Sequence, residues 1–268
     1  MGAASTMAGA RPASATGPFP TLPITSEATL AACSALDVGD GDVFIASYPK
    51  SGTTWTQAIV SALVSGGKRP RHVGDVAPFY EIDPHWRHDS DSGGSRYVGS
   101  PRAADAHARL GRRVFNTHLR HAMLPRGEGA RIVYVVRDCA DVCVSFFHHL
   151  ASQRGDAGRY DKGLDEFWRE WLRGELPYGR WSDHLASYAA AAAGDDPRVL
   201  VVSYEQLSSD LEGTARRIAS HIGAEPLEDV APFTFDGMRK ERDRVRMERR
   251  SCLPASRLAC ARRRMRPR

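Results

Sequence analysis

The chain has 268 residues, of which 42% are hydrophobic and 26% are charged, and this is the composition of a globular protein with a sizeable core. It excludes a collagen-like or wholly disordered chain, and uninterrupted apolar runs such as residues 132–136 are far too short to span a bilayer. The net charge of +5 does not indicate a nucleic-acid partner, because residues 239–268 carry 13 Lys and Arg against 3 Asp and Glu, which leaves the rest of the chain with a net charge of −5.

The cysteines predict neither disulfides nor a metal site. They are five in number, and no two of them form a Cys-x-x-Cys pair. No cluster of Cys and His residues has the spacing of zinc ligands. We therefore expect reduced thiols in a reducing compartment, a cytoplasmic location and no bound metal.

The first 36 residues are rich in Ala, Ser, Thr and Pro and contain no acidic residue before Glu27. Because no charged start is followed by a long apolar segment, a secretory signal is not expected. We expect a disordered leader over residues 1–36. Two alternatives are a transit peptide, which would usually carry more Arg, and N-myristoylation, because residues 1–6 match the loose pattern for that modification.

Strands and helices alternate through most of the chain. Residues 43–48 are β-branched and aromatic, which predicts a buried strand, and the spacing of apolar residues over 53–64 predicts a helix. This alternation predicts an α/β fold, a single domain over residues 37–238 with a central, mainly parallel β-sheet flanked by helices. The other expected elements are strands at 113–116, 131–136 and 199–203, helices at 138–150, 164–172, 181–193 and 207–222, and long loops with short helices over 66–105.

The turn between the first strand and the first helix, residues 48–55, suits a phosphate. It lies at the carboxyl end of a strand, where open α/β sheets bind ligands. Gly52 lets the backbone approach an anion, the helix start favours negative charge, and Lys50 adds a cation. In the nucleotide P-loop the Lys follows the glycine, so this loop is only P-loop-like and a P-loop kinase is not expected. Hydroxyl donors are supplied by Ser51, Thr53 and Thr54.

A second strand–helix junction begins at Arg137, directly after the strand at 131–136. An arginine at the carboxyl end of the sheet could hold a second phosphate in bidentate fashion, with Ser145 two turns further along the helix. From the residues alone, a surface arginine paired with Asp138 or Asp141 is the alternative.

His118 follows the short strand at 113–116 and lies between the two phosphate segments in the chain. A neutral imidazole suits a general base near pH 7. The chain has 10 histidines, however, so a structural or solvated role is the alternative for each of them.

Taken together, these segments resemble the cytosolic sulfotransferase family. The string Tyr-Pro-Lys-Ser-Gly-Thr-Thr-Trp at 48–55 is similar to the family's signature for the 5′-phosphosulfate of 3′-phosphoadenosine 5′-phosphosulfate (PAPS). Arg137 and Ser145 keep the spacing of its 3′-phosphate segment, and the Thr-His pair ending at His118 resembles its catalytic pair. Further similar segments are 176–184 and 199–205, and the resemblance covers about residues 37–238.

The resemblance implies a sulfotransferase that moves the sulfuryl group from PAPS to a hydroxyl or amine of a small molecule, without a metal. It implies His118 as the general base and Lys50 as the cation that stabilises the leaving oxygen. Phe79 falls where family members place an aromatic substrate gate, and Arg137 and Ser145 would bind the 3′-phosphate. The implied nucleotide-binding residues are Lys50, Ser51, Gly52, Thr53, Thr54, Trp55, Arg137, Ser145 and Tyr204, with Trp55 and Tyr204 beside the adenine.

The chain departs from the family in two places. Asn116 stands where many animal members have Lys, two positions before the histidine. After Met238 the family's Arg-Lys-Gly loop and Gly-Asp-Trp are missing, and residues 239–268 form a basic, Arg-rich tail. Such a tail has three interpretations: a truncated or frame-altered chain, arginines that replace the clamp on the 3′-phosphate, or a disordered basic arm. The alternative function is therefore a catalytically weak or inactive nucleotide-binding protein on the same fold.

Overall fold

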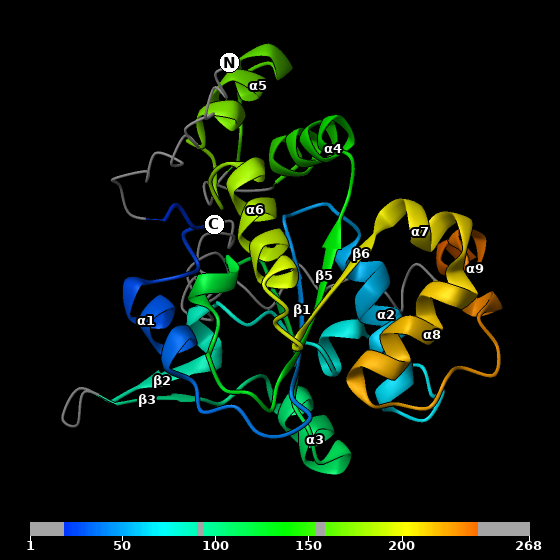
Figure 1. Cartoon of the computed structure of the whole chain (residues 1–268). Helices are drawn as coiled ribbons and strands as arrows, with labels where there is room; N and C mark the ends of the chain where they lie inside the picture. Colours follow the sequence, from blue (N-terminus) through cyan, green and yellow to red (C-terminus); the bar gives the residue numbers. More distant parts are fainter. Residues whose placement is uncertain (1–18, 90–93, 154–158, 241–268) are drawn as a thin grey trace, which may run out of the picture.

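A four-stranded sheet forms the centre of the computed structural model, which describes residues 19–89, 94–153 and 159–240 (Figure 1). Its strand order is β4-β1-β5-β6, and each pair of neighbours is parallel. The expected α/β fold with a mainly parallel sheet is confirmed. The strands are β1 (Val43–Ser47), β4 (Val114–Thr117), β5 (Arg131–Val136) and β6 (Val199–Ser203).

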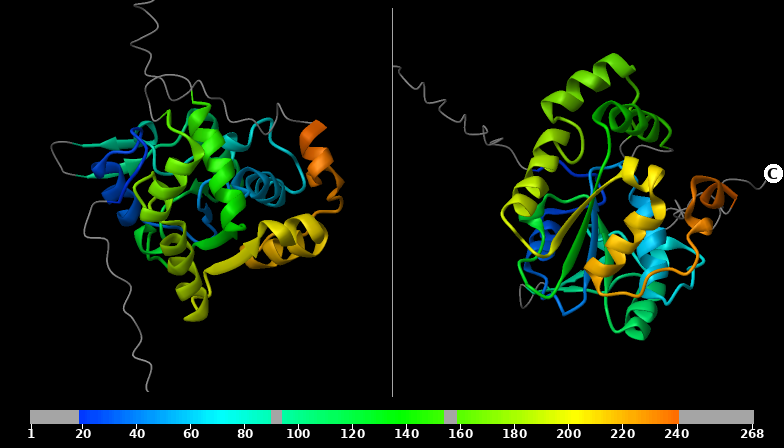
Figure 2. Two further views of the ribbon diagram at one scale, coloured as in Figure 1. Left: turned by 90° about the horizontal axis from the view of Figure 1, so that it is seen from above. Right: turned by 45° about the vertical axis from the view of Figure 1, so that its right-hand side comes forward.

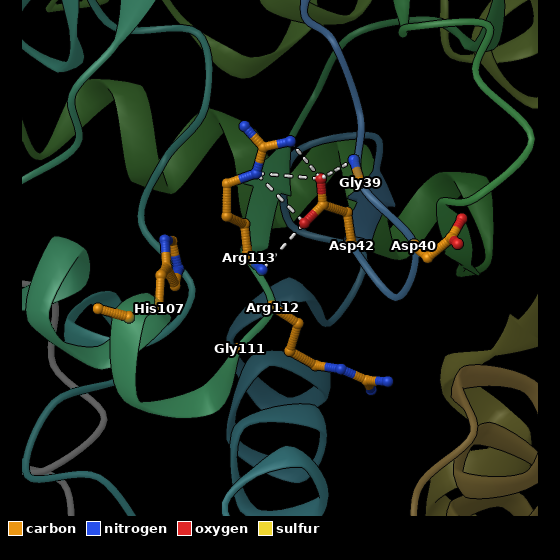
Figure 3. Close-up of a pocket in the computed structure, with 8 residues that line it drawn as sticks. Gly39, Asp40, Asp42, His107, Gly111, Arg112 and Arg113 are labelled. Atoms are coloured by element: carbon orange, nitrogen blue, oxygen red, sulfur yellow. Dashed lines mark hydrogen bonds and ion pairs between the residues drawn. The ribbon is translucent and has the colours of Figure 1, made fainter.

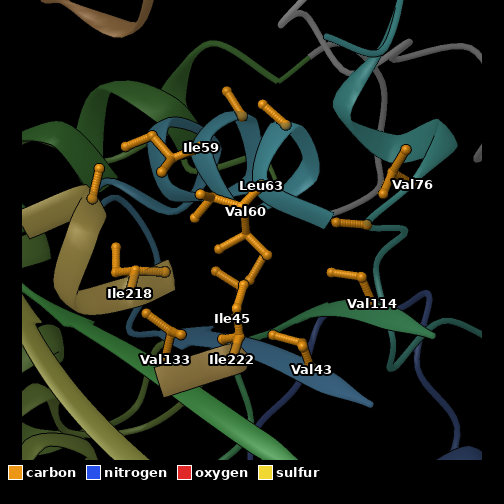
Figure 4. Packing of buried hydrophobic residues seen from close by; sticks show 14 of the residues in the cluster. Val43, Ile45, Ile59, Val60, Leu63, Val76, Val114, Val133, Ile218 and Ile222 are labelled. Carbon is orange, nitrogen blue, oxygen red and sulfur yellow. The ribbon is translucent and has the colours of Figure 1, made fainter. Parts of the chain in front are cut away.

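Strand β1 is buried along its whole length because helices cover both faces of the sheet. Its side chains alternate between the two faces. Val43 and Ile45 pack against α2 (Thr53–Val64) and α8 (Leu211–Ile222), which lie together on one side (Figures 2 and 4). Phe44 belongs to the core on the other side.

The second face of the sheet is covered by α1 (Glu27–Ala35), α6 (Trp181–Ala193) and a two-stranded hairpin. Tyr134 of β5 and Tyr188 of α6 stack with ring centroids 4.0 Å apart and planes inclined by 8°. The hairpin pairs β2 (Trp86–His88) with β3 (Ser95–Tyr97) in antiparallel fashion.

Helices α4 (Cys139–Ala151) and α5 (Leu164–Arg173) lie beyond the carboxyl ends of the strands (Figure 1). A third apolar cluster, which includes Tyr48, Phe146 and Trp171, joins them to the turn after β1. These helices therefore fix one wall of the region where the strands end. The remaining elements are η1 (Val73–Asp75), η2 (Asp83–His85), α3 (Pro101–Leu110), η3 (His121–Met123), α7 (Tyr204–Ser209), η4 (Ala231–Phe233) and α9 (Phe235–Lys240).

Two sequence-based expectations are wrong. The disordered leader does not extend to residue 36, because Ser26 caps α1 and the helix buries Thr29, Ala32 and Cys33 against the sheet side of the core. The single helix expected over 207–222 is two helices, because the backbone of Asp210 leaves the helical region and its carboxylate accepts the N–H of Gly213 at 2.9 Å to cap α8.

Smaller differences concern the ends of elements. The short strand runs over Val114–Thr117 rather than 113–116, and Asp138 is the N-cap of α4 rather than its first residue. The hairpin and α3 occupy much of the segment expected to be loops. Residues 1–18 and the tail from residue 241 onward lie outside the described residues.

A hollow of about 400 Å³ lies at the opposite end of the sheet, where β1 and β4 begin (Figure 3). Two of its charged groups, Asp42 and Arg113, are already paired: the Asp42 carboxylate accepts from Nε of Arg113 at 3.0 Å and from the N–H of Gly39 at 2.9 Å. Ligands of parallel sheets bind at the other end, where the strands finish. We therefore interpret this hollow as part of the scaffold.

Within residues 19–89, 94–153 and 159–240, no helix is long and apolar enough to cross a membrane. The same residues contain no group of three or more His, Cys, Asp or Glu side chains that could hold a metal ion. The described cysteines, Cys33, Cys139 and Cys143, form no disulfide.

Candidate active site

The turn from β1 to α2 contains two residues with left-handed backbone angles. Lys50 and Gly52 have φ angles of 71° and 105°, and Gly52 is the N-cap of α2. A Cβ atom at Gly52 would lie only 2.9 Å from Cδ2 of Tyr204. Gly52 is therefore required both by its backbone angle and by the close approach of Tyr204.

The hydroxyl groups of this turn point in different directions. Thr53 is buried, and its Oγ1 lies 2.5 Å from Oγ of Ser47, at the end of β1. Thr54 is exposed at the start of α2. Oγ of Ser51 is buried and has no hydrogen-bond partner among the described residues. A buried hydroxyl without a partner is costly, so Ser51 marks a place where an anionic ligand would supply the missing acceptor.

Arg137 and Tyr204 bring the ends of β5 and β6 to the same turn. Cζ of Arg137 lies 4.3 Å from the centroid of the Tyr204 ring. Trp55 meets that ring edge-on, with centroids 5.4 Å apart, and its indole N–H donates to the carbonyl of Phe233 at 2.6 Å. Residues expected from three separate segments of the sequence are thus brought together at the carboxyl end of the sheet.

The guanidinium of Arg137 is only partly engaged by the protein. Its Nη2 donates to Oδ2 of Asp141 at 2.7 Å, so the pairing considered as the alternative from the sequence is present. Its Nε is buried and has no hydrogen-bond partner among the described residues. Ser145 lies four residues beyond Asp141 on the same face of α4. The junction therefore retains one unused donor of a cation that binds phosphate well.

His118 follows β4 and is held close to the end of β1. Its Nδ1 lies 2.8 Å from the carbonyl oxygen of Ser47, which can only accept, so Nδ1 carries the proton and Nε2 carries the lone pair. The rings of Phe79 and Tyr178 lie 5.4 Å and 5.2 Å from the His118 ring. Burial lowers the pKa of His118 to about 4, and the nearby His149 and Lys50 act in the same direction. The imidazole is therefore neutral at pH 7 and has the form that a base requires.

Comparison with known proteins decides the family. A family model described as "Sulfotransferase domain" matches residues 40–251. The chain belongs to the sulfotransferase family. Human sulfotransferase 2B1 is 31% identical over 233 residues, which cover 83% of this chain and 58% of that protein. Cytosolic sulfotransferase 5 of Arabidopsis thaliana is 26% identical over 208 residues, which cover 73% of this chain and 58% of that protein. This sulfotransferase chain thus spans less than two thirds of the length of these relatives.

Solved structures share the fold. The crystal structure of mouse sulfotransferase SULT7A1 complexed with PAP superposes with a TM-score of 0.60 at 24% identity, and covers 80% of this chain and 71% of that chain. Retinol dehydratase in complex with androsterone and inactive cofactor PAP superposes with a TM-score of 0.63 at 22% identity, and covers 80% of this chain and 70% of that chain.

The sequence assigns no role to three residues that surround His118 in this chain. Glu81 accepts the backbone N–H of His118, and His184 donates to its carbonyl. Tyr178 presents its ring to His118, and its buried Oη has no hydrogen-bond partner among the described residues. A carboxylate inside the otherwise apolar run 79–82 is a sequence signal for Glu81. No comparable local signal links residues 178 and 184 to His118.

The buried titratable groups of this sulfotransferase predict how its stability depends on pH. Burial lowers the pKa of His118 to about 4 and that of His184 to about 3, whereas it raises the pKa of Glu81 to about 7. In the unfolded chain these groups titrate near 6.5 for His and 4.5 for Glu. Between pH 6.5 and 4.5 the unfolded state therefore binds two histidine protons that the folded state lacks, and the folded state binds one carboxyl proton that the unfolded state lacks.

We expect the free energy of unfolding to fall by at least about 1.4 kcal/mol for each unit by which the pH is lowered from 6.5 to 4.5, because on these three groups alone the unfolded state binds one net proton more. Above pH 6.5 the sign reverses, because Glu81 loses its proton as the pH passes about 7. Urea unfolding at pH 7.5, 6.5 and 5.0 measures the free energy of unfolding. His184→Gln removes one of the buried histidines and should make its dependence on pH below 6.5 less steep. A free energy of unfolding that is higher at pH 5.0 than at pH 6.5 would contradict this prediction. Burial also lowers the pKa of His85, His107 and His221, with the same sign.

Proposed function

We propose that this sulfotransferase moves the sulfuryl group of PAPS to a hydroxyl or amine of a small molecule. The observation that carries the proposal is a pair of unused donors, Oγ of Ser51 and Nε of Arg137, at two neighbouring strand ends. Each lies in a segment that resembles one of the family's two phosphate-binding segments. A hydroxyl and a guanidinium placed in this way fit a nucleotide that carries one phosphate at the 5′ position and another at the 3′ position of its ribose.

The nucleotide-binding residues follow from this arrangement. Lys50, Ser51 and Gly52, with Thr53 and Thr54 at the start of α2, would hold the 5′-phosphosulfate. Arg137 and Ser145 would hold the 3′-phosphate. The aromatic pair Trp55 and Tyr204, which already meet at 5.4 Å, would flank the adenine.

In the proposed reaction His118 takes the acceptor's proton at Nε2 while the acceptor's oxygen or nitrogen bonds to sulfur. The bond from sulfur to the bridging oxygen breaks, and Lys50 stabilises the charge that this oxygen acquires. Asn116 occupies the position of the family's second Lys, and its buried Oδ1 has no hydrogen-bond partner among the described residues. Lys50 therefore carries more of the charge stabilisation than in members with both lysines.

The acceptor is proposed to be a small molecule, in a cytoplasmic setting. The rings of Phe79 and Tyr178 pack against the His118 ring. An acceptor that reaches His118 would therefore contact aromatic side chains. Relatives include a luciferin sulfotransferase of Photinus pyralis and an amine sulfotransferase of Oryctolagus cuniculus, and a structural neighbour was solved with retinol and PAP.

A second candidate function is a weak or inactive nucleotide-binding protein. It is favoured by residues 239–242, which read Arg-Lys-Glu-Arg where the family has Arg-Lys-Gly, and by Asp141, which already occupies Nη2 of Arg137. With Glu241 in place of that glycine, the backbone approaches the 3′-phosphate less closely, and one or two charge-assisted hydrogen bonds are lost, each worth about 1.5–3 kcal/mol.

Calorimetric titration with 3′,5′-diphosphoadenosine, the product nucleotide, separates the candidates. We expect binding to the natural chain to be at least about tenfold weaker than binding to a chimera that carries the family's closing loop. Equal affinity would show that the arginines of residues 239–268 perform the clamp's role. If neither protein bound, the proposed nucleotide site itself would be wrong.

A further inference from the structure

The backbone of His118 is held at both its N–H and its carbonyl by buried side chains. Its N–H donates to Oε1 of Glu81 at 2.6 Å, and its carbonyl accepts from Nε2 of His184 at 3.0 Å. We propose that Glu81 and His184 are positioning residues that fix the His118 backbone, so that its ring can present Nε2 to the acceptor. The inference rests on the proposed role of His118 as the base.

Glu81 acts beside Thr117 at the end of β4. The side chain of Glu81 is fully buried, and the Thr117 side chain lies close to its carboxyl group. Oγ1 of Thr117 in turn accepts the N–H of Leu119 at 3.1 Å. The backbone of Glu81 is itself tied to the segment before α1, because Thr25 donates to its carbonyl. Glu81 and Thr117 thus hold the backbone N–H groups of His118 and Leu119.

His184 holds the carbonyl of His118 from α6. Its Nδ1 lies 3.2 Å from Oη of Tyr134, whose hydroxyl can donate, so Nε2 of His184 carries the proton that is donated to His118. The ring is fully buried and stacks on Tyr134 at 5.7 Å, and it meets Tyr48 edge-on at 5.6 Å. Because Tyr48 begins the phosphate turn, His184 packs between that turn and the proposed base.

These contacts leave few ways for His118 to move. The backbone of His118 is fixed at its N–H by Glu81 and at its carbonyl by His184, and the ring is fixed at Nδ1 by the carbonyl of Ser47. The remaining ring nitrogen is Nε2. Displacing a reacting group by about 1 Å can lower the rate by about 10²-fold. Loss of these contacts should therefore reduce turnover far more than nucleotide affinity.

Enzyme kinetics on matched variants tests the inference. We expect Glu81→Leu and His184→Phe each to lower kcat by about 10-fold or more, with the affinity for 3′,5′-diphosphoadenosine unchanged within about twofold. Glu81→Gln keeps an oxygen acceptor and should retain kcat within about threefold. Asp42→Asn, which perturbs a buried carboxylate at the opposite end of the sheet, is the control for general loss of stability and should leave kcat unchanged. Equal loss of kcat in Asp42→Asn and Glu81→Leu would overturn the inference.

A double-mutant cycle shows whether Glu81 acts through His118. In a His118→Ala background, Glu81→Leu should cause no further loss of kcat, whereas an additive loss would overturn the proposal. If Glu81→Leu does not fold, His184→Phe provides the same test through the carbonyl of His118.

Nitrogen-15 NMR of the histidine ring gives a readout that needs no turnover. The ring of His118 should be protonated at Nδ1 in the natural chain and should become a mixture of tautomers in Glu81→Leu and His184→Phe. An unchanged tautomer in both variants would overturn the inference. A chain that shows this change but sulfates no acceptor would instead refute the proposed function and leave the positioning contacts intact.

Discussion

Replacing His118 with Ala is expected to lower turnover by about 10²-fold or more and to leave nucleotide binding in place. The physical reason is that the Ser47 carbonyl holds the neutral His118 ring at Nδ1. This leaves Nε2 as the nitrogen that takes the acceptor's proton, and alanine has no such group. Because the pKa of His118 is lowered to about 4, the natural chain should keep its activity down to about pH 5. Steady-state kinetics with PAPS, together with calorimetry with 3′,5′-diphosphoadenosine, measure both quantities.

His107 provides a matched control for this experiment. It is a buried histidine of α3 that lies beside the start of β4, and its ring lies 2.8 Å from the carbonyl of Val76. His107→Ala removes an imidazole of equal size and should leave turnover per folded molecule unchanged. Retained turnover in a folded His118→Ala variant would remove His118 from the reaction.

The second large effect is a division of labour between Lys50 and Arg137. Lys50→Ala should lower kcat by about 10²-fold or more with little change in product-nucleotide affinity, because its charge partner is the oxygen that becomes charged as sulfur leaves. Arg137→Ala should weaken the binding of 3′,5′-diphosphoadenosine by about 10-fold to 10²-fold, because it loses a charge-assisted hydrogen bond to the 3′-phosphate. Kinetics and calorimetry on the two variants distinguish these effects.

Two further measurements sharpen this prediction. Arg216→Ala removes an exposed arginine that pairs with Glu212 on α8 and should change neither quantity, which controls for the loss of one positive charge. Adenosine 5′-phosphosulfate lacks the 3′-phosphate and should be a poorer donor than PAPS for the natural chain. Equal use of the two donors would show that Arg137 does not read the 3′-phosphate.

The sequence alone determined the elements whose signals are local. The strands at 131–136 and 199–203 and the helices at 53–64 and 181–193 have the bounds that their apolar patterns predict. The phosphate turn was also predictable, because a strand, a glycine with a left-handed backbone and a helix start follow one another within ten residues.

Tertiary structure decided what lies around the proposed base. Glu81 and His184 reach the His118 peptide from 37 and 66 residues away, and a local pattern cannot show which buried polar groups will pair across such distances. The same reason explains α1. Its polar and small residues predict disorder, but burial of Ala32 and Cys33 against the hairpin and the sheet stabilises a helix. Sequence thus determined where a phosphate can bind, because that depends on one turn, whereas the surroundings of His118 depend on how separate segments pack against one another.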